Sequence, residues 1–115
     1  MKNKLILMIC CFAIGISAMA QTKQKKTETF KVYGNCEMCK ETIEGALKKK
    51  DGIISKRWDA KAQTLTVCYD SSKITIQQIG QKVANVGYDN EYATSKDETY
   101  QNLHKCCQYK RPEKK

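Results

Sequence analysis

The chain has 115 residues, with 21 lysines and arginines against 12 acidic residues, 41% apolar residues and a single proline. Because a domain takes about 100–200 residues, this length excludes a large enzyme with a two-domain cleft and leaves room for one small domain. The mixed charge and the abundant apolar residues also exclude a wholly disordered chain. Seven cysteines are unusual in so short a chain, and their positions carry most of the functional information.

Residues 1–20 have the pattern of a cleaved signal peptide. Two lysines precede an apolar run that starts at Leu5, and the segment ends in Ala18-Met19-Ala20. The run is shorter than the roughly 20 residues that cross a bilayer, which disfavours the alternative of a membrane anchor. A lipoprotein is a weaker alternative, because Cys10 and Cys11 in this run lack the small preceding residue that a lipidation site requires. We therefore expect an exported, periplasmic protein without stable membrane insertion after cleavage.

Cleavage after Ala20 would leave 95 residues with five of the seven cysteines and a formal net charge of +7, from 19 basic and 12 acidic residues. Export implies an oxidising compartment in which thiols tend to pair. Because five is odd, at least one thiol is free, bound to a ligand or linked to another chain. The positive charge is spread among acidic residues, which predicts a solvated surface or an acidic partner and no nucleic-acid binding.

The mature chain predicts alternating strands and helices. A flexible lead over 21–27 precedes a strand over 29–33, in which Phe30 and Val32 share a face. Helical spacing follows from Cys39 and ends at the lysines 48–50, with Gly52 as the stop. Strands over 53–59 and 64–69 are joined by a hairpin loop.

A capping box over 75–78 predicts the start of a second helix, and Gly87 is placed to end it. A last short strand is predicted over 88–93. The order β-α-β-β-α-β predicts a ferredoxin-like α+β sandwich, with a four-stranded antiparallel sheet, two helices on one face and Trp58 in the core. This domain spans 28–94. A basic, cysteine-containing C-terminal extension over 95–115 follows, and a second capping-box pattern at 95–98 predicts a short helix in it.

Cys36-Glu37-Met38-Cys39 lies between the first strand and the first helix. Two thiols at this spacing in a turn can bind one ion, and a helix N-terminus stabilises the thiolate form. Thiolates select soft ions such as Cu(I) and Zn(II), although a structural zinc site is normally closed by four ligands. The same spacing also serves redox sites and structural disulfides, so a plain disulfide between Cys36 and Cys39 is the alternative interpretation.

The chain resembles the heavy-metal-associated domain family, the module of copper chaperones, metal-pumping ATPases and periplasmic mercuric-ion-binding proteins. The resemblance covers roughly 28–94 and rests on Val32-Tyr33-Gly34-Asn35-Cys36-Glu37-Met38-Cys39, Tyr69-Asp70 and Gly87-Tyr88. It implies that Cys36 and Cys39 bind one soft ion reversibly and release it by thiolate exchange. The family usually has Gly-Met-x-Cys before the first ligand, whereas this chain is one residue shorter there and lacks that methionine.

Other residues near the motif have open roles. Met38 could be an occasional weak ligand, but a gap-filling or solvent-facing residue is the more common role of such a methionine. Tyr88 is expected at the same end of the fold as the cysteine loop, where it either supports the site or packs in the core.

The remaining cysteines allow two arrangements. Cys68 should face outward on the uncovered face of the sheet, and a disulfide from Cys68 to Cys106 or Cys107 would hold the extension across that face. Alternatively, an extended segment after Thr94 could reach back to the metal loop. His104, beside these two cysteines, could be a ligand, although adjacent cysteines rarely chelate one ion well.

The sequence therefore predicts an exported, non-enzymatic protein that binds one soft ion, Cu(I) above all, through Cys36 and Cys39. Hg(II) or Zn(II) would be a variant of the same function, and a metal-transporting ATPase or another metal-binding domain is the expected partner. A small thiol–disulfide oxidoreductase is the rival from another class. Such enzymes normally have a larger fold with a supporting cis-proline, whereas the only proline here is Pro112 in the tail. A structural domain with disulfides and no metal is a third interpretation.

Overall fold

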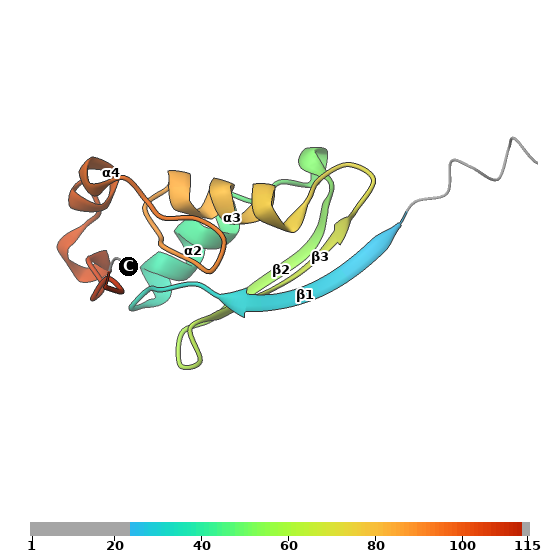
Figure 1. Ribbon diagram of the computed structural model, residues 1–115. Helices are drawn as coiled ribbons and strands as arrows, with labels where there is room; N and C mark the ends of the chain where they lie inside the picture. Colours follow the sequence, from blue (N-terminus) through green and yellow to red (C-terminus); the bar gives the residue numbers. More distant parts are fainter. Residues whose placement is uncertain (1–23, 114–115) are drawn as a thin grey trace, which may run out of the picture.

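A computed structural model describes residues 24–113 (Figure 1). Its elements, in chain order, are β1 (Lys25–Lys31), α2 (Glu37–Gly45), the 3-10 turn η2 (Lys49–Asp51), β2 (Ile53–Asp59), β3 (Thr64–Asp70), α3 (Ile76–Asn85), α4 (Asp97–Gln101) and the 3-10 turn η3 (Lys105–Cys107). The predicted signal peptide lies outside the described residues. Within 24–113, no helix has the length and apolar character that crossing a membrane requires.

The sheet is antiparallel with strand order β1-β3-β2, and α2 and α3 cover one of its faces (Figure 1). The core lies between these two layers. Phe30, Leu65 and Val67 contribute from the sheet, and Ile43 and Val83 contribute from the helices. Trp58 is fully buried, as predicted. The ferredoxin-like arrangement of helices on one face of an antiparallel sheet is therefore confirmed.

The prediction of a fourth strand over 88–93 is wrong. This segment makes only one isolated bridge, between Val32 and Asn90, and the sheet has three strands in the described part of the chain. The Asn90 side chain accepts hydrogen bonds from the backbone N–H groups of Tyr92 (3.0 Å) and Ala93 (3.2 Å). An asparagine that caps its own following backbone in this way turns the chain. The segment consequently leaves the sheet after one residue pair.

The first strand begins earlier than predicted, at Lys25, so residues 25–27 of the expected flexible lead belong to β1. Lys25 pairs with Asp70, and Thr27 pairs with Cys68. The side chains of residues 25–27 are exposed, so no apolar alternation marks this part of the strand. Its position is instead set by backbone pairing along the edge of β3.

The helix ends combine correct and incorrect predictions. At the start of α3, the Thr75 hydroxyl oxygen accepts the Gln78 backbone N–H, and the Gln78 side-chain oxygen accepts the Thr75 backbone N–H. These two bonds confirm the capping box. Gly87 follows α3 with a φ of 114°, a conformation that favours glycine. The helix α2 ends at Gly45, before the predicted lysines, and Gly52 instead follows η2 with a φ of 103°. The helix predicted in the extension is present as α4, but no side chain caps its start.

The C-terminal extension returns to the cysteine-loop end of the fold, beside the N-terminus of α2 (Figure 1). Tyr109 anchors it: its ring is buried, stacks on Tyr88 at 5.6 Å between ring centroids and meets Tyr100 edge-on. The Tyr109 hydroxyl donates to the Gly87 carbonyl and accepts from the Asp89 N–H, each at 2.8 Å. The tail is thus packed onto the domain through both apolar and polar contacts.

A second anchor is the ion pair between Arg111 and Asp89. Arg111 binds both carboxylate oxygens of Asp89, at 2.8 Å and 3.0 Å, and reaches Asp97 at 2.7 Å. The Asp89 side chain is only 4% exposed, so its charge depends on this fork of donors. The same carboxylate accepts the Ser95 N–H at 2.7 Å, which fixes the turn that leads into the extension.

We expect Arg111→Met to lower the free energy of unfolding by about 3 kcal/mol, because it leaves the Asp89 carboxylate buried without its cation. Urea unfolding of the reduced mature protein would measure this change. Lys110→Met is the matched control, since Lys110 is exposed in the adjacent position. Equal urea midpoints for the two variants would contradict the role of Arg111 as an anchor.

Candidate metal centre

The loop between β1 and α2 is shaped by Trp58. The Trp58 indole N–H donates to the Val32 carbonyl at 3.0 Å, and the Gln63 side chain donates to the Gly34 carbonyl at 2.8 Å. Gly34 lies directly against the indole ring: a Cβ added to it would lie 2.8 Å from Trp58 Cζ2. A glycine is therefore required for the loop to approach this ring closely. Trp58 lies under the loop that leads to Cys36.

Cys36 and Cys39 meet at the start of α2. Cys36 is the N-cap residue and is partly exposed, whereas Cys39 lies in the first turn and is fully buried. Their Sγ atoms are 3.6 Å apart, and both cysteines are free. The Cys39 Sγ accepts the Asn35 N–H at 3.4 Å. The structure does not contain the alternative, a disulfide between Cys36 and Cys39.

The helix N-terminus favours the thiolate form of Cys36. Its pKa lies below the ordinary value, chiefly because the backbone N–H of Cys39 donates to its Sγ, with a smaller contribution from the Met38 N–H. Hydrogen bonds to the charged form of a thiol stabilise that form and lower its pKa. A partly exposed thiol with a lowered pKa is the kind that binds metal ions and exchanges ligands readily.

The extension brings two more thiols to this pair. The Sγ atoms of Cys36, Cys106 and Cys107 all lie within 4.8 Å of one another. Cys106 Sγ is 3.8 Å from Cys107 Sγ, and the Asn35 side-chain amide donates to the Cys106 carbonyl at 3.1 Å. We call Cys36, Cys39, Cys106 and Cys107 the sulfur cluster; Cys39 is not in the group of three and joins the cluster through its 3.6 Å separation from Cys36 and its hydrogen bond with Cys107.

The disulfide from Cys68 to the tail, one of the two arrangements that the sequence allows, is absent, because Cys68, Cys106 and Cys107 are all free. The other arrangement considered from the sequence, in which the tail reaches the metal loop, is the one observed. Cys68 lies on β3, in register with Thr27 of β1 and Ser55 of β2. The turn at Asn90 explains the outcome, since it sends the chain back toward the loop before the sheet could carry it to the opposite end.

Three neighbouring residues differ in their relation to the cluster. Met38 is 44% exposed, and its Sδ is 3.8 Å from Cys106 Sγ. Tyr88 is fully buried; its hydroxyl makes no hydrogen bond of ordinary geometry within the described residues, and its titratable neighbours are Cys39 and Cys107. His104 is exposed and is not a member of the group of thiols that could share an ion.

Burial, in contrast, raises the pKa values of the groups that lie deeper in this site. It is the main cause that raises the pKa of Cys107 to about 12, and a hydrogen bond with Cys39 adds to the rise. Burial likewise raises the pKa of Tyr88 above its ordinary value, with the adjoining sulfurs as smaller causes. The cluster therefore combines an accessible thiol in which the thiolate is favoured with a buried thiol that keeps its proton in the absence of a cation.

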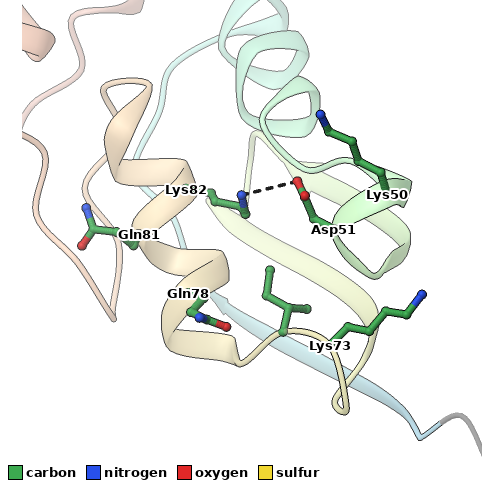
Figure 2. A pocket seen from close by; sticks show the side chains of 7 residues that line it. Lys50, Asp51, Lys73, Gln78, Gln81 and Lys82 are labelled. Atoms are coloured by element: carbon green, nitrogen blue, oxygen red, sulfur yellow. Dashed lines mark ion pairs between the residues drawn. The ribbon is translucent and has the colours of Figure 1, made fainter.

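A surface hollow of the protein lies elsewhere. Figure 2 shows it between α3 and the η2 turn, where Lys82 forms an ion pair with Asp51 at 3.4 Å and Lys50 and Lys73 contribute further positive charge. Its lining contains no cysteine. Lys73 follows β3, whereas the sulfur cluster lies beyond the opposite end of that strand. The hollow and the cluster are consequently separate features.

The sequence profile of the heavy-metal-associated domain matches residues 29–89, slightly more than half of the chain. The chain belongs to the heavy-metal-associated domain family. The match includes Cys36 and Cys39 and ends before the extension, so Cys106 and Cys107 lie outside the part that defines the family.

Individual relatives agree with this membership. The copper chaperone CopZ of Staphylococcus saprophyticus is 34% identical over 64 residues, which are 55% of this chain and 94% of that protein. A zinc-transporting ATPase of Synechocystis is 32% identical over 71 residues, 61% of this chain, but the match is only 10% of the ATPase.

Among solved structures, a CopZ metallochaperone matches with a TM-score of 0.54 and 32% identity, covering 56% of this chain and 98% of that one. Oxidized MerP from Ralstonia metallidurans matches with a TM-score of 0.55 and 25% identity, over 59% of this chain and 96% of that one. Membership supports metal binding and transfer as the general function of this heavy-metal-associated domain.

We expect Gly34→Ala to lower the free energy of unfolding by about 1–3 kcal/mol, because the added methyl group would overlap the Trp58 ring and force the loop or the ring to move. Gly45→Ala is the control, since nothing lies within 4 Å of an added Cβ at this position in α2. There we expect no loss and a gain of up to about 1 kcal/mol. Urea unfolding of both variants checks the prediction, and an unchanged midpoint in Gly34→Ala would contradict it.

Proposed function

We propose that this protein is an exported carrier of one soft metal ion, Cu(I) above all, which Cys36 and Cys39 bind and release by thiolate exchange. The observation that carries the proposal is the pair of free thiols 3.6 Å apart at the N-terminus of α2, one partly exposed and one buried. Thiolates prefer Cu(I) and Zn(II) to hard cations. The similarity to a protein named as a copper chaperone supports Cu(I) as the first choice.

The difference in exposure between the two thiols suggests a sequence for transfer. Cys39 is held in the core and by the Asn35 N–H, so it keeps its position while ligands change. Cys36 lies at the surface, where an acceptor's thiolate can approach the ion. The acceptor's sulfur bonds to the ion, the bond to Cys36 then breaks, and the released thiolate takes a proton from solvent. A second acceptor sulfur replaces Cys39 in the same way, which completes the transfer. No electrons change hands in this exchange.

Zn(II) and Hg(II) are variants of the same proposal. The similarity to part of a protein named as a zinc-transporting ATPase supports Zn(II) as an alternative cargo. The proposed acceptor is a metal-transporting ATPase or another metal-binding domain, because such ATPases contain segments similar to this chain. We assign no catalytic reaction to the protein. Efficient reduction of insulin disulfides by the purified protein would instead favour the thiol–disulfide oxidoreductase.

Cu(I) titration of the reduced mature protein under anaerobic conditions, in competition with a chromogenic Cu(I) chelator, tests the assignment. We expect one tightly held equivalent in the wild type and at least a tenfold weaker affinity in Cys36→Ser with Cys39→Ser, because the double variant loses both thiolates at the helix N-terminus. Cys68→Ser is the control and should bind as the wild type does. Unchanged Cu(I) affinity in the double variant would show that the site is elsewhere.

Export is the second part of the proposal and rests on the sequence pattern of residues 1–20. Expression of the full chain in a bacterial host should give a periplasmic product whose intact mass corresponds to a start at Gln21, because signal peptidase cleaves after an A-x-A pattern. The mass also distinguishes the lipoprotein alternative, which would add an acyl modification at a cysteine. A cytoplasmic product of full length would contradict export.

A further inference from the structure

The C-terminal extension adds two thiols to a site that has two cysteines within the residues matching the family. Cys106 and Cys107 lie outside the residues that match the family, yet both belong with Cys36 to a group whose Sγ atoms are within 4.8 Å of one another. We propose that Cys106 and Cys107 are additional ligands of the ion held by Cys36 and Cys39, so that at least three sulfur atoms enclose it. This inference rests on the proposed function and adds to it a second, tail-derived half of the metal site.

The separations between sulfur atoms fit a site of higher coordination. With metal–sulfur bonds of about 2.3 Å, two sulfurs on opposite sides of an ion would lie about 4.6 Å apart, whereas a tetrahedral arrangement places them about 3.8 Å apart. The observed separations are 3.6 Å between Cys36 and Cys39 and 3.8 Å between Cys106 and Cys107. Both pairs are therefore closer than a linear two-sulfur site would need, and both are near the spacing of a site with four ligands.

The tail is built to hold these thiols in place. Tyr109 is buried two residues beyond Cys107, and Arg111 is fixed to Asp89 two residues further along. On the other side, the Asn35 amide binds the Cys106 carbonyl at 3.1 Å, which ties η3 directly to the cysteine loop. A chance approach of a free tail would not involve a buried aromatic ring and a two-oxygen ion pair on the same segment.

Tyr88 provides a second observation that fits metal-bound sulfur. Its hydroxyl is buried, has no hydrogen-bond partner of ordinary length within the described residues and adjoins the sulfurs of Cys39 and Cys107. A buried hydroxyl is normally paired, and an unpaired one calls for an explanation. Beside metal-bound sulfur it would have a strong acceptor, because a thiolate accepts a hydrogen bond better than a protonated thiol does. Metal binding would thus satisfy Tyr88 as well as the thiols.

Binding of the ion by the tail thiols requires no oxidant or reductant. Each tail thiol that joins the ion forms one metal–sulfur bond and releases one proton to solvent. In transfer, an acceptor's thiolate replaces one tail sulfur at the ion, and the displaced thiolate takes up a proton. The exposed Cys106 is the ligand that leaves first, before the partly exposed Cys36, since Cys107 is buried against Tyr88 and Cys39.

The coordination number of Cu(I) tests the proposal. X-ray absorption of the reduced mature protein, loaded with one equivalent of Cu(I), should give three or more sulfur neighbours in the wild type and in Cys68→Ser. It should give two, with shorter copper–sulfur bonds, in the variant that combines Cys106→Ser with Cys107→Ser. Two sulfur neighbours in the wild type would overturn the inference while leaving the Cys36–Cys39 site intact.

Thiol alkylation of the wild type avoids any dependence on how the variants fold. One equivalent of Cu(I) should slow the reaction of Cys36 and Cys106 with iodoacetamide at least tenfold, while Cys68 reacts at an unchanged rate, as read by mass spectrometry of the digest. Protection of Cys36 without protection of Cys106 would overturn the role of the tail and leave the proposed function standing. Protection of neither would overturn both.

Discussion

The contacts of Asp89 hold together the end of the protein that carries the cysteine loop. Its carbonyl accepts the Tyr33 N–H at 3.0 Å beside the cysteine loop, and its N–H donates to the Tyr109 hydroxyl in the tail. Its carboxylate holds Ser95 and Arg111 at the same time. A buried carboxylate is tolerated when it is fully hydrogen-bonded and paired, and here all its partners lie in the segments that the fold must bring together. Through its backbone and its side chain together, this one residue ties the first loop, the turn after α3 and the extension into one unit.

The sulfur cluster gains its properties from that arrangement. The start of α2 alone would present one partly exposed and one buried thiol, which suits rapid exchange with an acceptor. The extension places a second buried thiol, Cys107, and an exposed one, Cys106, against them. Burial favours protonated thiols in the absence of a cation, whereas a bound cation favours thiolates. Ion binding and the packing of the tail against the loop are therefore expected to support each other.

Local signals in the sequence were sufficient for much of the fold. The strands β2 and β3 and the capping box of α3 were predicted from neighbouring residues, and all three elements are present, with β3 one residue longer than predicted. The early start of β1 had no such signal, because residues 25–27 are exposed and their order comes from pairing with β3. The fourth strand failed on a single side chain, Asn90, whose turn-forming hydrogen bonds compete with continued pairing to β1.

The turn at Asn90 also explains why the sequence did not decide which part of the fold Cys106 and Cys107 approach. A full last strand would have delivered the chain to the end of the sheet near Cys68, and that expectation favoured the wrong partner. Two signals could have indicated the observed path. Tyr109 follows Tyr100 and Leu103 in the extension, and such large apolar residues are more typical of a packed segment than of a solvated one. Arg111 lies in a basic run, but its fork of donors suits a buried carboxylate as no lysine does.

A carrier of the proposed kind must also be able to release its ion. The contacts that anchor the extension are at Tyr109 and Arg111, whereas Cys106 in η3 contacts the loop through the amide of Asn35 and through sulfur contacts. Loss of one metal–sulfur bond at Cys106 therefore leaves the rest of the tail anchored. An acceptor's thiolate would compete first with this exposed ligand, and the ion would stay attached to the buried sulfurs until further acceptor thiolates replace them. The anchor thus allows retention and release to be adjusted independently, because changes at Cys106 alter the exchange without loosening the fold.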